Sequence, residues 1–223
     1  EIFPRSILVG EKYGTIRVRI DQPSHEDKIW EVTTLRKDGG YGDGRRPDNV
    51  NFGSSIEEDL SRRDYTINSM AIDDAGNVID PHGGIGDLDK GIIRCVGSPS
   101  ERIGEDGLRI IRAFRFMELG ERGLRDLDRG LSKAISSNLD MLEKISRERV
   151  WSELKIILSG TNAPKIVDTM RTHGVIDKIL DGITHGEIFG NSTNYCVNLA
   201  LMCKGDNSDG EKLSSLLKEK LKL

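Results

Sequence analysis

The 223-residue sequence is poor in cysteine, histidine and aromatic residues. Its three cysteines form no Cys-x-x-Cys pair, and no two of its four histidines have metal-ligand spacing, which argues against a zinc site. No run of eighteen apolar residues is present, so the sequence predicts no membrane span. Hydrophobic residues still make up 36% of the chain, which is enough for a modest core.

Charge is abundant and nearly balanced. Charged residues make up 31% of the sequence and the net charge is −4, which does not indicate a general nucleic-acid binder. Any nucleic acid would therefore be bound by a local basic patch. Residues 1–5 lack the apolar segment of a signal peptide, and scattered cysteines fit a reducing compartment, so we expect a cytoplasmic location.

The chain divides into two parts with different sequence patterns. Residues 14–20 alternate apolar with polar residues, and residues 29–35 are rich in β-forming residues, so both predict strands. Residues 37–51 are rich in Gly, Asp and Arg and predict a mobile loop. From Ser98 onward the pattern is helical. A strand-rich part followed by a helical part is the α+β arrangement. We expect three domains, at residues 1–97, 98–160 and 161–223.

Helix-capping residues and the spacing of apolar residues predict further helices and strands. Ser55 and Glu58 fit a capping box that begins a short helix, with a hairpin loop expected earlier at residues 21–25. Short strands are expected at residues 66–73, 78–80 and 92–96. Helices are expected at residues 124–135, 147–158, 163–173, 194–203 and 211–221.

Two charged runs, residues 62–68 and 105–116, are the most informative feature. Within the second run, Asp106, Arg109 and Arg112 would share one face of a single helix. A carboxylate beside a planar guanidinium can read the edge of a nucleotide base, and further arginines can bind phosphates. The alternative is a solvated helix laced with ion pairs. The apolar residues around the second run leave it little free surface, which argues against that alternative.

Four motifs occur in a fixed order: Glu-Val-Thr-Thr-Leu-Arg at 31–36, Arg-Arg-Asp at 62–64, Asp-Pro-His-Gly-Gly at 80–84 and Glu-Asp-x-x-Arg at 105–109. Together they resemble the class II tRNA nucleotidyltransferases, or CCA-adding enzymes, of the polymerase-β-like superfamily, which includes bacterial poly(A) polymerases. The resemblance covers roughly residues 8 to 160. It implies an α+β fold, with a polymerase-β-like nucleotidyltransferase head of mixed sheet and helices followed by an all-helical neck and body.

The resemblance also implies an activity and its participants. The intact enzyme would transfer CMP and AMP from CTP and ATP to the 3′ end of tRNA by a two-metal mechanism with Mg²⁺. The helical body at 161–223 would bind tRNA, and the run at 146–149 resembles the start of a neck helix that braces the base-reading helix. The implied roles are metal binding and catalysis for Glu31, ribose recognition for Arg63 and Asp64, base recognition for Glu105, Asp106 and Arg109, and support of the nucleotide and its phosphates for Arg112 and Arg115.

One part of the family pattern is missing. The family's Gly-Gly-x-Val-Arg-Asp opening and its strand-borne Asp-x-Asp metal ligands do not occur in residues 1–30. We therefore expect an N-terminally incomplete chain that is inactive alone. A poly(A) polymerase and a non-catalytic tRNA- or nucleotide-binding fragment remain as alternatives. The length of the loop at 37–51 argues against an enzyme that adds only CC.

Overall fold

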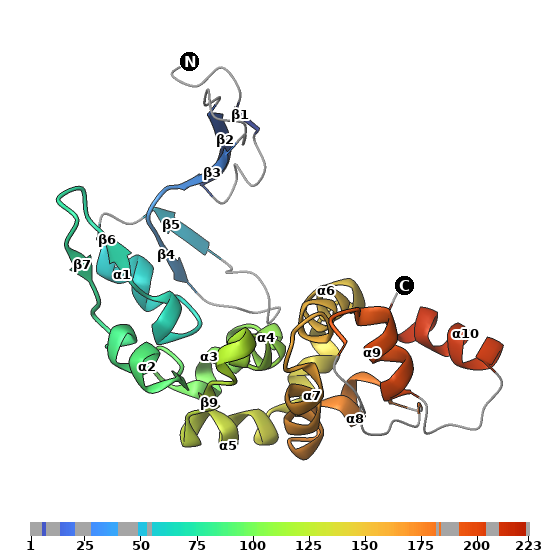
Figure 1. Ribbon diagram of the computed structural model, residues 1–223. Coiled ribbons are helices and arrows are strands. Elements are labelled where there is room, and N and C mark those ends of the chain that lie inside the picture. Colours follow the sequence, from blue (N-terminus) through green and yellow to red (C-terminus); the bar gives the residue numbers. More distant parts are fainter. Residues whose placement is uncertain are drawn as a thin grey trace. The chain divides into compact units, whose positions relative to one another are not determined.

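The computed structural model describes residues 6–7, 14–20, 28–39, 49–52, 55–181, 183, 192–203 and 210–221 (Figure 1). These residues form two compact units. The first unit holds the described residues up to Arg62, and the second begins at Arg63. The domain boundaries near residues 97 and 160 remain predictions.

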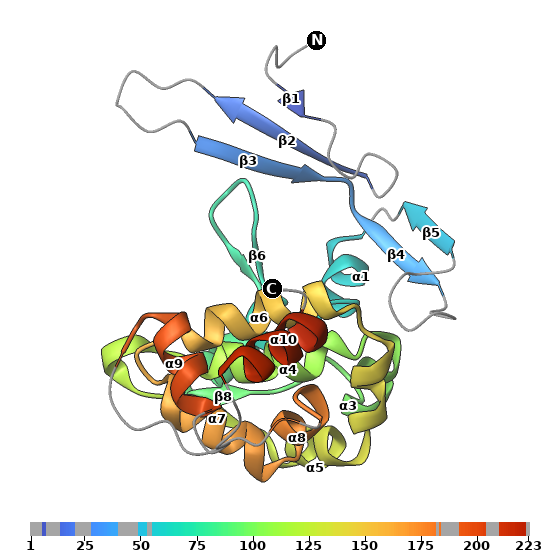
Figure 2. The ribbon, with the colours of Figure 1, turned by 90° about the vertical axis from the view of Figure 1, so that its right-hand side faces the viewer.

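The first unit is built on an antiparallel sheet of β1 (Ser6–Ile7), β2 (Thr15–Ile20) and β3 (Lys28–Thr33). Figure 2 shows β2 and β3 as the two long arrows of this sheet. Their register pairs Val18 with Trp30, and Val18 is buried, as the alternating pattern predicts. The two predicted strands are therefore confirmed, whereas the predicted hairpin loop at 21–25 lies outside the described residues.

A second pair of strands corrects the prediction of a loop over residues 37–51. β4 (Arg36–Gly39) and β5 (Asn49–Phe52) pair antiparallel, so both ends of that segment belong to a small sheet. Residues 40–48 lie outside the described residues. Gly-rich composition suggested a loop, but pairing between the two ends satisfies their backbone groups, which composition does not reveal.

Helix α1 (Ile56–Ser61) begins where the sequence predicts, but without the expected capping box. The hydroxyl of Ser55 donates to the carboxylate of Glu57 instead of accepting from a backbone amide. At the other end of the helix, Arg62 binds the buried carboxylate of Asp59 at 2.6 Å.

The second unit begins with a turn where a strand was predicted. Residues Thr66–Asn68 form a 3₁₀ helix (η2), and the strand β6 is limited to Ala71–Ile72, paired with β7 (Val78–Ile79). The Thr66 hydroxyl donates to Asp87 at 2.7 Å, and the Asn68 amide donates to Asp64 at 3.2 Å. Such side-chain bonds compete with strand pairing and favour the turn.

The predicted helix at 124–135 is wrong in its first part. β9 (Asp126–Leu127) pairs in parallel with β8 (Ile92–Ile93), and α5 (Arg129–Ser137) begins only afterwards. The Asp128 side chain accepts from the Gly130 amide at 2.9 Å and fixes the start of α5 as an N-cap.

The remaining helices largely follow the predicted pattern. The predicted helix at 147–158 matches α6, and those at 163–173, 194–203 and 211–221 match α7, α9 and α10 to within one residue at their ends. The helices are α2 (Gly84–Lys90), α3 (Pro99–Glu105), α4 (Leu108–Met117), α6 (Arg147–Leu158), α7 (Ala163–Thr172), α8 (Val175–Ile179), α9 (Tyr195–Met202) and α10 (Gly210–Leu221), with 3₁₀ turns η3 (Gly120–Arg122) and η4 (Leu139–Lys144).

The core of the second unit is centred on α4. Ile110, Ile111 and Phe114 of this helix are fully buried, and α4 packs against both α6 and α7. The α+β prediction is confirmed. In the part of the chain that the structure describes, no helix has the length and apolar character to cross a membrane.

Candidate nucleotide-recognition site

The run at 105–116 is broken into two helices, which corrects the prediction of one continuous face. α3 ends at Glu105, and Asp106 has φ −152°, so it lies in the turn before α4. A Cβ at Gly107 would overlap the carbonyl group of Met141, so only glycine fits this close approach of two backbones. Arg109 lies on α4, but Asp106 does not share its face.

Arg109 and Asp106 are each held by a different charged partner. Arg109 is buried, and its Nη1 donates to Glu105 Oε2 at 2.5 Å and to the carbonyl oxygen of Arg102 at 2.9 Å. Asp106 Oδ2 accepts from Arg149 Nη2 at 2.6 Å, and Asp106 Oδ1 accepts from the backbone amide of Leu108 at 3.0 Å. The turn therefore presents a fixed carboxylate next to a helix whose first turn carries a fixed guanidinium.

Arg112 joins this helix to the first charged run. Its Nε donates to Asp64 Oδ2 at 2.8 Å, while Asp64 Oδ1 accepts from the Tyr65 amide at 2.9 Å and from Asn68 Nδ2 at 3.2 Å. Burial lowers the pKa of Arg112, but the charge and hydrogen bond of Asp64 and the charge of Glu153 raise it, and the net shift is upward. Arg112 is therefore firmly charged in this site.

Arg115 is anchored on the opposite side, by α6. Its Nε lies 3.1 Å from Glu153 Oε2, and Arg112 Nη1 lies 3.6 Å from Glu153 Oε1. Both guanidinium groups also lie over the ring of Phe116, at 4.4 Å for Arg115 and 5.1 Å for Arg112. Burial lowers the pKa of Arg115, and the neighbouring Glu153 opposes that shift.

Sequence reasoning did not single out Glu153 as a site residue. For Arg149 the sequence predicts only a place at the start of the helix that braces the base-reading helix. The two residues are four positions apart on α6, which is the spacing of one helix face, and this spacing was the available signal. The structure shows that this face of α6 holds Asp106 through Arg149, and Arg112 and Arg115 through Glu153.

Arg63 is exposed next to the buried Asp64, and its Nη1 lies 3.5 Å from the carbonyl oxygen of Asn68. Glu31 lies in the first unit, on β3. It is exposed, and its Oε1 binds Nε and Nη2 of its cross-strand partner Arg17 at 2.9 and 2.7 Å. Among the described residues, no group of three His, Cys, Asp or Glu side chains could hold a metal ion.

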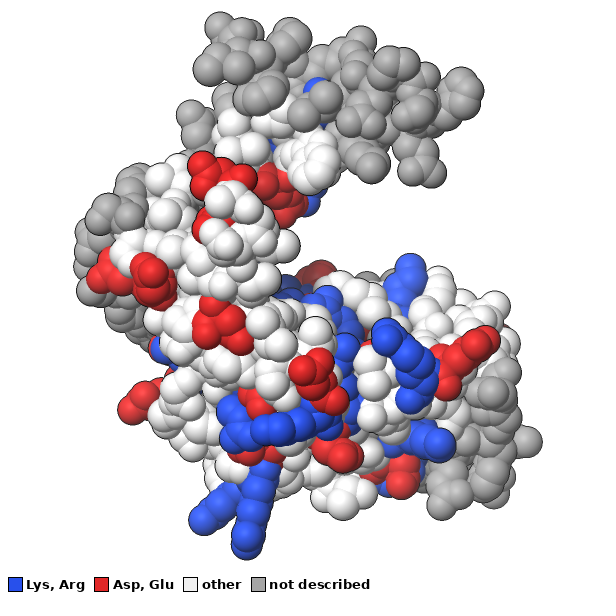
Figure 3. All heavy atoms as spheres, turned by 60° about the vertical axis from the view of Figure 1, so that its left-hand side comes forward, with Lys and Arg blue, Asp and Glu red and all other residues white. Residues whose placement is uncertain are grey.

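Charges of both signs cover the second unit. In the lower, helical part of Figure 3, Lys and Arg side chains are interspersed with Asp and Glu side chains. Neither sign forms a continuous face in this view.

Two family models match the chain. Residues 1–94 match the poly(A) polymerase head domain, and residues 126–186 match the probable RNA- and SrmB-binding site of polymerase A. The CCA-adding enzyme of Geobacillus thermodenitrificans is 43% identical over 175 residues, which are 78% of this chain and 41% of that enzyme. The chain belongs to the family of the CCA-adding enzymes and poly(A) polymerases.

Other relatives agree with this family. The CCA-adding enzyme of Lactobacillus johnsonii is 44% identical over 153 residues, or 69% of this chain and 36% of that enzyme. The chain thus spans about two fifths of the length of the curated relatives it matches.

Solved structures of the family share the fold. The Bacillus stearothermophilus CCA-adding enzyme in complex with CTP is 39% identical with a TM-score of 0.67, over 78% of this chain and 40% of that one. A tRNA-processing enzyme in an apo form is 26% identical with a TM-score of 0.72, over 94% of this chain and 60% of that one. The predicted nucleotidyltransferase head followed by helices is confirmed.

Proposed function

We propose that this chain forms the nucleotide-recognition part of an enzyme that transfers CMP and AMP from CTP and ATP to the 3′ end of tRNA. The observation that carries the proposal is the turn between α3 and α4, where Arg149 fixes the carboxylate of Asp106 and Glu105 fixes the guanidinium of Arg109. Similarity to CCA-adding enzymes over 78% of the chain supports it.

The donor and acceptor pattern of the bases explains the selection of C and A. A carboxylate offers about four acceptor positions, and two of those on Asp106 are used by Arg149 and Leu108. Cytosine and adenine each carry an exocyclic amino donor, whereas guanine and uracil carry a carbonyl acceptor at the corresponding edge. Asp106 would accept from the amino group, and a carbonyl in its place would leave a polar group unpaired.

The other residues have supporting roles in this proposal. Arg112 and Arg115 would hold the nucleotide phosphates, because charged guanidinium groups bind phosphate in a bidentate way. Arg63 and Asp64 would recognise the ribose. Asp64 already accepts from Tyr65, from Asn68 and through two nitrogens of Arg112, so a sugar hydroxyl would have to share one of these positions.

A divalent metal completes the proposed chemistry. When bound, Mg²⁺ would lower the pKa of the RNA 3′-hydroxyl and neutralise the leaving pyrophosphate. Glu31 would supply one carboxylate oxygen to it. A single carboxylate does not make a metal site, and the base recognition proposed above needs none.

The RNA partner is proposed to be tRNA, bound by the helical part of the chain. The match of residues 126–186 to an RNA-binding family model supports this assignment. When lysines and arginines neutralise RNA phosphates, the counterions of those phosphates are released. The affinity for tRNA should therefore fall as the salt concentration rises.

The test of the proposed function is nucleotide binding by the full chain. Asp106→Ala and Arg109→Ala should each remove the preference for CTP and ATP over GTP and UTP, with about a tenfold loss of selectivity. The exposed Asp140 provides a matched control, since Asp140→Ala should leave the preference unchanged. If both site variants keep the original preference, these residues form structural ion pairs only.

A poly(A) polymerase is the second candidate, because residues 1–94 match the poly(A) polymerase head domain. The same titration distinguishes the two candidates. Comparable binding of CTP and ATP supports CCA addition, whereas binding of ATP without CTP supports poly(A) addition.

A further inference from the structure

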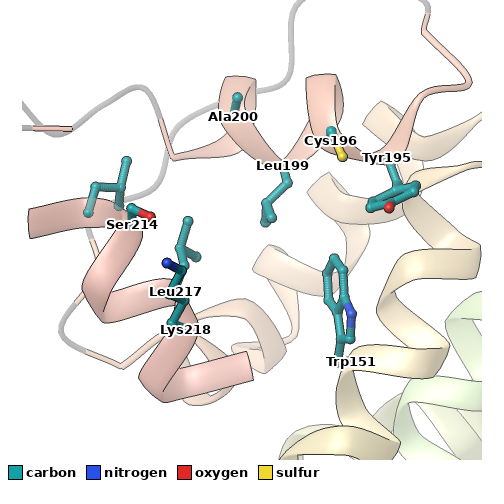
Figure 4. A pocket seen from close by; sticks show the side chains of 9 residues that line it. Trp151, Tyr195, Cys196, Leu199, Ala200, Ser214, Leu217 and Lys218 are labelled. Carbon is teal, nitrogen blue, oxygen red and sulfur yellow. The ribbon is translucent and has the colours of Figure 1, made fainter. Parts of the chain in front are cut away.

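A pocket of about 530 Å³ lies between α6, α9 and α10, away from the face of α6 that holds Asp106 and Arg112. Figure 4 shows Trp151 and Tyr195 on one side of the pocket and Leu217 and Lys218 on the other. The Trp151 and Tyr195 rings meet edge to face, with centroids 5.9 Å apart and planes at 68°. The pocket thus has an aromatic wall and an apolar floor, the usual lining of a site for a planar ligand.

Positive charge lies at this pocket without a described counter-charge. The Lys155 ammonium lies 4.5 Å from the centre of the Tyr195 ring, and Lys218 lines the pocket itself. Both lysines are exposed, and within the described residues neither forms an ion pair with Asp or Glu. A planar ring placed between Trp151 and Leu217 would lie beside Lys218, which lines the pocket, and on the aromatic side Lys155 lies against Tyr195.

From this combination we propose that the pocket binds an unstacked base of single-stranded RNA, together with its phosphate. A base offers a flat apolar face to Trp151 and Tyr195, and the phosphate of the same nucleotide offers the negative charge that Lys155 and Lys218 attract. An apolar segment of another protein would fill the floor of the pocket but would not use the two cations. The inference rests on the proposed function, since it adds a second RNA contact to an RNA-processing enzyme.

α6 connects this pocket to the recognition site. Arg149 and Glu153 lie on the face of α6 toward α3 and α4, and Trp151 and Lys155 lie toward α9 and α10. RNA held at the pocket would be anchored to the helix that also positions Asp106. The pocket would hold an RNA base while the recognition site selects the incoming nucleotide.

The experiment uses the intrinsic fluorescence of Trp151. The sequence contains two tryptophans, so Trp30→Phe in the full chain leaves Trp151 as the reporter, and Trp30 is 53% exposed in β3. This variant is titrated with an adenosine hexanucleotide and with an abasic ribose-phosphate chain of the same length. We expect the hexanucleotide to quench Trp151 and the abasic chain to bind about tenfold more weakly.

Pocket variants in the Trp30→Phe background sharpen the test. Tyr195→Phe should retain the affinity, whereas Tyr195→Ala should lose about tenfold. Lys218→Ala should reduce the affinity and its salt dependence, while Lys133→Ala, an exposed lysine on α5, serves as the matched control with no effect on quenching.

Each contrary outcome overturns the inference. Equal binding of the abasic chain shows that phosphates alone are recognised, and RNA binding without a change in Trp151 emission places the RNA elsewhere. If free AMP binds as tightly as the hexanucleotide, the pocket is a mononucleotide site. If none of the probes binds, the pocket is a groove for a protein segment. If the RNA titrations give one of these results while the protein still prefers CTP and ATP over GTP, the RNA-base pocket is rejected and the proposed function is retained.

Discussion

Arg112 contacts Asp64 through two nitrogens, Nε at 2.8 Å and Nη2 at 2.6 Å, across forty-eight positions of the sequence. The Asp64 side chain is 10% exposed and that of Arg112 is 29% exposed, so the pair is largely removed from water. It ties the end of the Arg-Arg-Asp motif to the middle of α4. The two charged runs that the sequence shows far apart are thus one connected feature.

This pair should make a measurable contribution to stability. Asp64→Ala and Arg112→Ala should each lower the free energy of unfolding by about 1–3 kcal/mol, because each leaves a largely buried partner without the two hydrogen bonds of this pair. The double variant should lose less than the sum of the two single losses, which urea denaturation of all four proteins measures. Asp140→Ala, at a 93% exposed carboxylate bound to Lys178, should change stability by less than about 0.5 kcal/mol. Strict additivity of the two losses would contradict the coupling.

Arg149 should act on base selection through Asp106. Arg149→Met keeps an unbranched apolar stem but removes the donor 2.6 Å from Asp106 Oδ2, so the carboxylate loses its fixed orientation. We expect the preference for CTP over UTP to fall about tenfold or more, since a hydrogen bond to a charged group is worth about 1.5–3 kcal/mol. Arg147→Met, two positions earlier on the same helix, is the matched control. Equal effects of the two variants would assign Arg149 a role in general stability instead.

Two glycines of α2 should respond oppositely to the same substitution. A Cβ at Gly84 would overlap the carbonyl oxygen of Thr66 and lie 2.9 Å from Met70 Sδ, whereas a Cβ at Gly86 meets nothing within 4 Å. Gly84→Ala should therefore lower the free energy of unfolding by about 1–3 kcal/mol, as overpacking does. Gly86→Ala should raise it by about 0.5–1 kcal/mol, because alanine loses less backbone entropy in a helix. Thermal melting compares the two, and a similar shift for both would reject the close approach of α2 to η2.

Local signals predicted elements well where neighbours in sequence decide the structure. Ser146 and Gly160 flank α6, and residues 14–20 alternate as β2 does. The break between α3 and α4 was missed because Gly107 is required by the carbonyl group of Met141, which is remote in sequence. β9 was missed for a similar reason, since its partner is β8.

The candidate site likewise depends on contacts between residues that are remote in sequence. The residue types and their order predict Asp64, Asp106, Arg109 and Arg112 as site residues, because these motifs are local in sequence. Their partners were not identifiable in the same way, because the contacts of Arg149 with Asp106 and of Glu153 with Arg115 arise only when α6 packs on α4. Pairing across helices depends on tertiary packing, which spacing along one helix does not specify.

The three cysteines should differ sharply in reactivity. Cys196 is exposed at the start of α9, whereas Cys95 and Cys203 are buried. Burial raises the pKa of Cys95 to about 12 and that of Cys203 to about 11, so neither forms the nucleophilic thiolate near pH 8. One thiol per chain should react rapidly with an aromatic disulfide reagent at pH 8, and all three should react in denaturant. Cys196→Ser should abolish the rapid phase.

The same two buried thiols predict the sign of a change in stability at alkaline pH. Below the ordinary thiol pKa of 9.0, both the folded and the unfolded states hold the proton of each thiol. In that range the two thiols do not lower the free energy of unfolding. Above that value the unfolded state releases the proton while the folded state retains it. The free energy of unfolding should therefore fall as pH rises from about 9 toward the folded pKa values of about 11 and about 12. Denaturant titrations of the wild type and of Cys203→Ala across this range measure the effect, and the variant should show the shallower decline. Identical slopes would show that Cys203 is already accessible to solvent in the folded protein.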